Sequence, residues 1–333
     1  MSMRTAVSKI ALPPPSAATD GPRLEDRLRA AGHEVVVADR WTNADLARIF
    51  GDVDVVVASP ARPYPGELFA VAPRLRLITS PVIGVDTIDL DAASEFGVLV
   101  ANCPTAENII GIAEATIMLI VASLLKLKQK ERSLRDGHFR PHHASHLLHG
   151  RTVGLIGYGR IARSVEQRLQ GWGVTVHAAD PYVPGTLSLD ELLRTSDVVS
   201  LHVVLTKETR NMIGARELAL MKPSALLVNT SRGGAIVEEA LAEAIDAGCL
   251  AGAALDVFQQ EPIDMSNPLL RCDPDKVILT PHSIGHNLES GPTGVQMAFD
   301  NIDRALRGEL PESVINREVI PAWRRRMAML DPQ

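Results

Sequence analysis

The segment Thr152–Asp180 constrains the fold of this chain more than any other part of its sequence. It holds a short apolar run, a glycine-rich turn, a helical pattern and a second apolar run that ends at Asp180. The turn, Gly157-Tyr158-Gly159-Arg160-Ile161-Ala162, fits the pattern G-x-G-x-x-G/A. A strand, a turn, a helix and a strand in this order predict an α/β unit.

Each part of the turn has a physical task if a dinucleotide binds there. Gly157 allows the tight turn, Gly159 lets the backbone approach a pyrophosphate, and Ala162 is small enough for helix and strand to pack. The N–H groups at the start of the helix, at Arg160 and Ile161, and the positive end of its dipole suit the phosphates. This context favours a cofactor site over an ordinary tight turn.

Asp180 distinguishes between two such cofactors. It lies about 20 residues after Gly159, where a carboxylate accepts hydrogen bonds from the adenosine ribose. A carboxylate at this point would repel a 2′-phosphate, so the sequence favours NAD over NADP.

The composition excludes several classes of partner and compartment. A length of 333 residues allows about two domains. The net charge of −6 argues against nucleic acid or an anionic membrane as the main partner. Three separated cysteines indicate a reducing compartment, and Lys9 with the prolines at 13–15 interrupts any signal-peptide core. We therefore expect a cytoplasmic protein without nucleic-acid or membrane partners.

Apolar runs alternate with helical patterns through most of the chain, which predicts parallel sheets with helices on both faces. Strands are expected at 34–38, 54–58, 75–79, 98–101, 197–202, 225–229, 252–256 and 277–280. Helices are expected at 24–31, 44–50, 88–96, 188–195, 217–221 and 238–247. The longest helical pattern lies within 102–135 and is apolar on nearly all sides, which predicts burial in the core or against a second subunit. Its uncharged run, Ala115–Leu125, is too short for the ~20 residues that a bilayer needs.

Two loops have alternative interpretations. The N–H groups around Ile83 and Gly84 follow a predicted strand, and they suit either a carboxylate ligand or a structural turn. Arg62 is either a solvated cation or a side chain that binds an acidic substrate.

Five histidines lie at positions 138, 142, 143, 146 and 149. The spacing of His142 and His146 would suit two metal ligands, but Pro141 and the lack of acidic residues favour a solvated linker.

Three polar residues each stand just past a predicted strand: Arg232, Glu261 and His282. In an open parallel sheet the ligand crevice lies at the carboxyl ends of the strands. Alone, each has an ordinary structural explanation, as a surface ion pair, a solvated acid or a hydrogen-bonded histidine. Their shared position beside a dinucleotide unit favours a common site.

From about Leu75 to Asn316 the chain resembles the D-isomer-specific 2-hydroxyacid dehydrogenases. The matching segments are IGVDTIDLDAASEFGVLVANCP, GRTVGLIGYGRIA, SLHVVLTKETRNMIG, MKPSALLVNTSRGGAIVEEALAEAI, GAALDVFQQEP, NPLL and ILTPHSIG. The resemblance implies that His282 is the general acid/base, that Glu261 pairs with it and raises its pKa, and that Arg232 binds the carboxylate of a 2-keto acid. It assigns Ile83 and Gly84 to the same carboxylate.

The resemblance also implies the cofactor groove and the architecture. The residues it places in the groove are His202, Val203, Val204, Thr209, Thr230, Ser231, Arg232, Asp256, which would hold the nicotinamide carboxamide, and Thr116. The fold would be α/β, with two doubly wound, Rossmann-like parallel-sheet domains and a cleft between them. Residues 1–101 plus 285–333 would form the substrate-binding domain and 102–284 the dinucleotide-binding domain, with a homodimer joined through the latter.

The expected function is that of an NAD-dependent oxidoreductase interconverting a small 2-keto acid and its D-2-hydroxy acid. Pro81, Thr87 and the segment from Ser283 to Asn287, including His286, depart from the family pattern and leave the substrate open. Phosphoglycerate dehydrogenase, or a member acting on a phosphorylated or phosphonylated acid, is an alternative, weakened by the absence of an appended regulatory domain. A formate dehydrogenase is disfavoured, because an amide stands there in place of Glu261. A dinucleotide-sensing co-repressor is the non-enzyme alternative.

Overall fold

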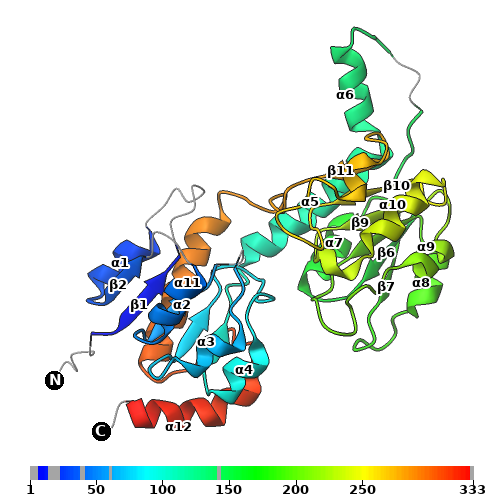
Figure 1. The fold of residues 1–333 in the computed structure, drawn as a ribbon. Coiled ribbons are helices and arrows are strands. Elements are labelled where there is room, and N and C mark those ends of the chain that lie inside the picture. Colours follow the sequence, from blue (N-terminus) through cyan, green and yellow to red (C-terminus); the bar gives the residue numbers. More distant parts are fainter. Residues whose placement is uncertain (1–6, 14–22, 38–41, 60–61, 141–143, 331–333) are drawn as a thin grey trace. The chain divides into compact units, whose positions relative to one another are not determined.

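The structure is a computed structural model that describes residues 7–13, 23–37, 42–59, 62–140 and 144–330 (Figure 1). The chain divides into two compact units, Met1–Asn108 with Asn287–Gln333, and Ile109–His286. We call them unit 1 and unit 2. The boundaries expected from the sequence lie a few residues away from these.

Unit 1 is built on a parallel sheet with the strand order β2-β1-β3-β4-β5. The strands are β1 (Lys9–Leu12), β2 (Glu34–Val37), β3 (Val55–Val57), β4 (Leu77–Thr79) and β5 (Leu99–Ala101). The helices are α1 (Leu24–Ala30), α2 (Asn43–Phe50), α3 (Gly66–Ala70), α4 (Leu90–Glu95), α11 (Ser290–Leu306) and α12 (Ile320–Leu330). Each strand is apolar on both sides because helices cover both faces. Val56 and Ile78 pack with α2, α3 and α4, whereas Val55 and Leu77 pack with α1, α11 and α12.

Unit 1 is discontinuous in sequence, and its C-terminal part is held by buried hydrogen bonds. The side chain of Asn316 accepts the N–H of Val100 at 2.8 Å. Trp323, which is fully buried on α12, donates its indole N–H to the carbonyl of Arg76 at 3.0 Å. The last helix is therefore part of the core of unit 1.

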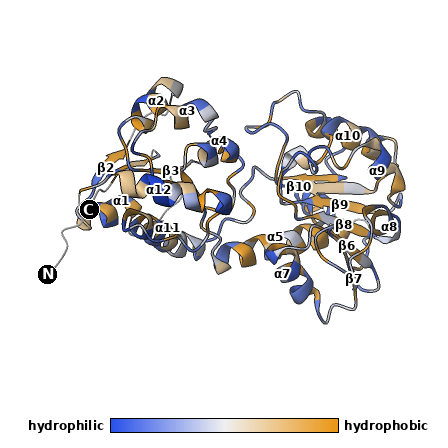
Figure 2. Cartoon of the chain, turned by 90° about the horizontal axis from the view of Figure 1, so that it is seen from below, coloured by the Kyte–Doolittle hydropathy of each residue, from blue (hydrophilic) through white to orange (hydrophobic). Residues whose placement is uncertain are grey.

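Unit 2 is built on a parallel sheet with the order β11-β10-β9-β8-β6-β7. The strands are β6 (Thr152–Ile156), β7 (Thr175–Ala179), β8 (Val198–Leu201), β9 (Leu226–Asn229), β10 (Gly252–Leu255) and β11 (Val277–Leu279). The helices α5 (Ala106–Leu124) and α7 (Arg160–Leu169) pack on one face, and α8 (Leu189–Thr195), α9 (Ala215–Leu220) and α10 (Glu238–Asp246) on the other. Figure 2 shows hydrophobic residues in these strands, whereas helices such as α10 carry both hydrophobic and hydrophilic residues. Strand order reverses between β6 and β8, which defines the switch point of the sheet.

The predicted fold class is confirmed, and most predicted elements are present with ends shifted by a residue or two. Ser188 caps α8, since its side chain accepts the N–H of Glu191. Four elements had no predicted range: β1, α3, α11 and α12. β1 and α3 show no clear sequence pattern, because β1 is only four residues long and precedes a run of prolines, and α3 lies within a proline-rich loop.

The single long helix expected within 102–135 was wrong. Two helices replace it, α5 and α6 (Leu127–Arg135), because Lys126 adopts the left-handed conformation with φ 54°. Met118 and Leu125 are 46% and 40% exposed in the single chain, so burial in the core is incomplete, and burial against a second subunit stays a prediction.

By length and composition alone, α5 could cross a membrane, with a mean hydropathy of 1.6 over 18 residues. No membrane-spanning segment was expected from the sequence. The core helix of a globular protein meets the same criteria, and Ala113, Ile117 and Ile120 on α5 pack in the core of unit 2.

Candidate active site

The glycine turn follows β6 and meets the loop after β8 at the switch point of unit 2. Gly157 has φ +81°, and a Cβ there would lie 2.7 Å from the carbonyl oxygen of His202, so only glycine fits without displacement. A Cβ on Gly159 would meet nothing within 4 Å, so open space lies beside this backbone at the N-terminus of α7. Ala162 is fully buried against the sheet, as the packing of helix on strand requires. The geometry thus provides a concave turn with space for a ligand beside Arg160 and Ile161.

Asp180 directly follows β7, and its side chain lies against the glycine turn. One oxygen accepts the N–H of Tyr158 at 2.8 Å, and the other accepts the N–H of Tyr182 at 2.9 Å. A carboxylate oxygen has two lone-pair sites, so each retains capacity for a ligand hydroxyl. Asp180 therefore both fixes the turn and presents a negative charge at the end of β7.

Four predicted groove residues lie on the loop after β8. His202 is held at the strand end by its N–H, which donates to Ile156, and its Nε2 lies 3.0 Å from the hydroxyl of Ser200. Desolvation lowers the pKa of His202 to about 4, so the imidazole is neutral at pH 7. Thr209 donates to the carbonyl of Val204 at 2.7 Å and accepts the N–H of Thr206, which fixes the loop. Val203 packs against the core, whereas Val204 is 69% exposed.

The loop after β9 is shaped by Asn229, a fully buried residue that the sequence analysis did not select. Its Oδ1 accepts both the N–H and the hydroxyl of Ser231, and its Nδ2 donates to the carbonyl of Arg232 at 2.9 Å. The guanidinium of Arg232 donates to the carbonyl of Ser231 at 2.6 Å. The available signal was an amide at a predicted strand end, three residues before an arginine.

Thr116 and Thr230 meet across two elements. Thr116 on α5 is fully buried, donates to the carbonyl of Ile112 at 2.8 Å and lies 2.9 Å from the hydroxyl of Thr230. A hydroxyl has one proton, so when Thr116 donates within its helix, Thr230 donates to Thr116. Thr116 therefore orients the β9 loop.

Glu261 and His282 form a close pair. Nδ1 of His282 lies 2.6 Å from Oε2 of Glu261, and Oε1 of Glu261 accepts the N–H of Phe258 at 3.0 Å. The hydrogen bond to Glu261 raises the pKa of His282 despite desolvation. Burial acts to raise the pKa of Glu261, but the hydrogen bonds from His282 and Phe258 outweigh it, and the result is a lowered pKa. With Nδ1 directed at the carboxylate, Nε2 is the nitrogen left for a ligand.

Asp256 connects β10 to the segment that carries His282. This carboxylate is 4% exposed and accepts the hydroxyl of Thr280 at 2.7 Å and the N–H groups of Ser283 and Ile284 at 3.1 and 3.2 Å. His282 itself has φ 51°, an uncommon conformation for a non-glycine residue. Asp256 thus holds the backbone on which this strained histidine stands.

These residues gather because their strands are adjacent and in register. Leu255 pairs with Asn229 on one side and with Leu279 on the other. Arg232, Asp256, Glu261 and His282 therefore all follow the carboxyl ends of β9, β10 and β11. Arg232 lies close enough to affect electrostatically the pKa of both Glu261 and His282, lowering each.

The remaining predicted residues lie elsewhere. Ile83 and Gly84 are in unit 1 after β4, where their carbonyls accept from Asn102 and Ser80 at 2.7 Å each. Arg62 is exposed. His142 and His143 fall outside the described residues, and no metal-binding group of His, Cys, Asp or Glu occurs in the described part of the chain.

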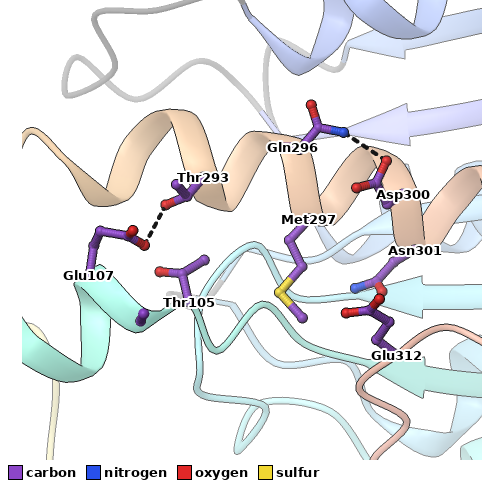
Figure 3. Close-up of a pocket in the computed structure, with 9 residues that line it drawn as sticks. Thr105, Glu107, Thr293, Gln296, Met297, Asp300, Asn301 and Glu312 are labelled. Carbon is purple, nitrogen blue, oxygen red and sulfur yellow. Dashed lines mark hydrogen bonds between the residues drawn. The ribbon is translucent and has the colours of Figure 1, made fainter.

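Unit 1 contains a cavity of about 310 Å³ between the start of α5 and α11 (Figure 3). Its lining includes Glu107, which accepts the hydroxyl of Thr293, and Asp300, which accepts the amide of Gln296. Glu312 on its rim pairs with Arg304 at 3.3 Å. The predicted catalytic residues do not line it.

Comparison with known proteins places this geometry in a family. Residues 117–283 match the profile described as D-isomer specific 2-hydroxyacid dehydrogenase, NAD binding domain. D-3-phosphoglycerate dehydrogenase of Methanocaldococcus jannaschii is 38% identical, with 86% of this chain covering 56% of that protein. Glyoxylate reductase of Korarchaeum cryptofilum is 36% identical, with 81% of this chain covering 84% of that protein.

The chain belongs to the D-isomer specific 2-hydroxyacid dehydrogenase family. A crystal structure of a glyoxylate reductase from Paecilomyes thermophila is similar to this dehydrogenase, with a TM-score of 0.84 and 26% identity, covering 94% of this chain and 99% of that one. The resemblance inferred from the motifs is thereby confirmed. The dehydrogenase spans little more than half of the phosphoglycerate dehydrogenase that it matches.

NAD is the cofactor of this chain, as the matched domain is an NAD-binding domain. The residues at the switch point fit it. The space beside Gly159 suits a pyrophosphate, and Asp180 offers acceptor oxygens at the end of β7, where ribose hydroxyls are bound in such folds.

Proposed function

We propose that this chain catalyses the reversible NADH-dependent reduction of a small 2-keto acid to its D-2-hydroxy acid. The observation that carries the proposal is the His282–Glu261 pair, with 2.6 Å between Nδ1 and Oε2, at the same sheet edge as the Arg232 loop. A guanidinium for a carboxylate and an imidazole for a carbonyl oxygen are the two groups that this reaction needs.

The protein's residues perform the steps that surround hydride transfer. Bound NADH supplies the hydride. Arg232 binds the carboxylate of the keto acid and polarises its carbonyl. Protonated His282 gives the proton on Nε2 to the carbonyl oxygen, and in oxidation neutral His282 takes it back. Glu261 fixes the tautomer and stabilises the imidazolium between these states. The assignment of the substrate carboxylate to Ile83 and Gly84 stays a prediction.

The substrate is proposed to be an unphosphorylated acid of glyoxylate size. The similarity to the glyoxylate reductase of Korarchaeum cryptofilum supports this substrate, because the match to this chain covers 84% of that protein's length. A phosphorylated acid is the second candidate, and the 38% identical phosphoglycerate dehydrogenase favours it. A panel of glyoxylate, hydroxypyruvate, pyruvate and 3-phosphohydroxypyruvate with NADH distinguishes them by kcat/KM. A preference for the phosphorylated acid would overturn the first choice.

The same assay separates an enzyme from a dinucleotide-sensing co-repressor. NADH consumption with any member of the panel supports the enzyme. Tight NADH binding with no consumption by any acid would leave the sensor as the better proposal.

We further propose a cytoplasmic homodimer formed through unit 2, without nucleic-acid or membrane partners. Exposed apolar side chains support a subunit contact: Met118 on α5, Leu125 between the two helices, and Leu127 and Leu134 on α6. Sedimentation equilibrium at micromolar concentration tests it, and a monomer would oppose it.

A further inference from the structure

Glu238 is a buried carboxylate that is hydrogen-bonded to the loop of the acid/base pair, and neither the resemblance nor the proposed reaction assigns it a role. It is the first residue of α10 and is 5% exposed. Its Oε1 accepts the backbone N–H of Gln259 at 2.7 Å, and its Oε2 accepts the amide Nδ2 of Asn267 at 2.6 Å. Burial of a carboxylate against two neutral donors is costly, although the helix N-terminus offsets part of the cost.

The hydrogen bonds define the chemical form of this side chain. Oδ1 of Asn267 accepts the N–H of Leu269 at 3.0 Å, so the amide is oriented with its NH₂ group toward Glu238. Both neighbours of Glu238 therefore donate, and both of its oxygens accept. A group at this position must offer two acceptors, which a carboxylate does and an amide does not.

Glu238 lies on a short segment that holds the loop of Glu261 at several points. The N–H groups of Phe258 and Gln259 are consecutive, and they donate to Glu261 and Glu238 respectively. The side chain of Gln259 also donates to the carbonyl of Ile236 at 2.7 Å. The backbone of Phe258 lies so close to Gly233 that a Cβ there would collide with it. The segment 232–238 thus carries Arg232, and it also holds residues 258–261 by hydrogen bonds and close packing.

We propose that Glu238 is a positioning residue for the acid/base pair, because its carboxylate fixes the loop that aims Glu261 at His282. This inference rests on the proposed function. Glu238 acts through Glu261 and Phe258, whereas the charged groups that act on His282 directly are Glu261, Asp256 and Arg232. Loss of the Glu238 contact would leave a buried N–H unsatisfied and release the loop.

The test uses the full-length protein with Glu238→Gln, which keeps the shape but removes one acceptor. The matched control is Glu239→Gln on the neighbouring, exposed residue. The rescue is Glu238→Gln combined with Asn267→Asp. In that pair the new carboxylate accepts from the new amide and from Leu269, and the amide oxygen accepts from Gln259, so every hydrogen bond is restored.

Two readouts separate positioning from simple destabilisation. The first is the titration of the His282 imidazole by NMR on histidine-labelled protein, assigned with His282→Asn. The second is kcat and KM for keto-acid reduction as a function of pH. We expect Glu238→Gln to lower the pKa of His282 and to reduce kcat about tenfold, with the KM for NADH within about twofold of wild type. The control should match the wild type, and the rescue should restore both values.

A folded Glu238→Gln variant with an unchanged His282 titration overturns the proposal, even if its melting temperature falls. If that variant does not fold, the combined variant decides, since a wild-type titration supports positioning and a displaced one opposes it. The NMR readout needs no turnover. If the wild-type protein reduces no keto acid, the proposed function fails. The NMR titration of His282 still decides whether Glu238 positions Glu261.

Discussion

Glu261 is held at both of its oxygens, one by the N–H of Phe258 at 3.0 Å and the other by Nδ1 of His282 at 2.6 Å. A carboxylate fixed in this way cannot turn from the imidazole without breaking a second hydrogen bond. It therefore acts on one chosen ring nitrogen and leaves Nε2 as the proton donor. Because the hydrogen bond to Glu261 raises the pKa of His282, the protonated form persists to higher pH than for an ordinary histidine.

Glu261→Gln should move the pH dependence of the reaction to lower pH. Reduction requires protonated His282, and its rate is lost as the pH rises through the raised pKa. Without the carboxylate this pKa falls, so reduction is lost at lower pH and oxidation begins to rise at lower pH. Profiles of kcat/KM in both directions check this. Unchanged midpoints in the variant would contradict the role of Glu261.

His282→Asn should reduce turnover by about 10²-fold or more, which is the usual contribution of a general acid. Asparagine is a better probe than alanine because it tolerates the left-handed conformation that His282 adopts at φ 51°. NADH binding, measured by fluorescence, should stay near the wild-type value. His286→Asn on the same segment is the control, and an equal loss of turnover there would argue against a special role for His282.

Two glycine substitutions should separate folding from cofactor binding. Gly159→Ala should leave the melting temperature unchanged but weaken NADH binding, because its Cβ enters the open space beside the turn. Gly157→Ala should destabilise the protein by about 1–3 kcal/mol, because its φ is positive and its Cβ approaches His202.

The control for the second substitution is Gly185→Ala, which shares a positive φ but has nothing within 4 Å of its Cβ. Denaturant unfolding should show the smaller loss there. Full NADH affinity in Gly159→Ala would place the cofactor elsewhere.

Asp180→Arg should shift the preference from NADH toward NADPH, since it replaces repulsion of a 2′-phosphate by attraction. It also removes the acceptor for Tyr158 and Tyr182. Asp180→Asn is therefore the companion variant, as it removes the charge and keeps one of the two acceptor oxygens. The ratio of kcat/KM for the two cofactors is the measurement, and a ratio unaltered in both variants would count against Asp180 as the ribose ligand.

The sequence predicted the sheets well because their strands are buried on both faces and so appear as continuous apolar runs. The run VVV in β3 and the run LLVN in β9 are examples. It failed where a local backbone choice decides the outcome. No residue pattern predicts that Lys126 adopts the left-handed backbone conformation, which separates α5 from α6.

In the candidate active site, too, some residues could be predicted from the sequence and others could not. Residues just past strand ends could be found from sequence, as Arg232, Glu261 and His282 were, because topology alone brings strand ends together. Asn229 was missed although it stands at a predicted strand end. Glu238 could not be found, because its role depends on a hydrogen bond from a backbone group that only the folded chain places within reach.

The return of residues 287–330 to unit 1 affects how the chain is made. Asn316 and Trp323 bond to β5 and to the residue before β4, so the first unit to leave the ribosome lacks part of its core until the last helix emerges. The inserted unit is continuous and needs nothing that comes later. During synthesis unit 2 should reach its native state first. The N-terminal strands of unit 1 should stay partly exposed to solvent until their C-terminal partners are made.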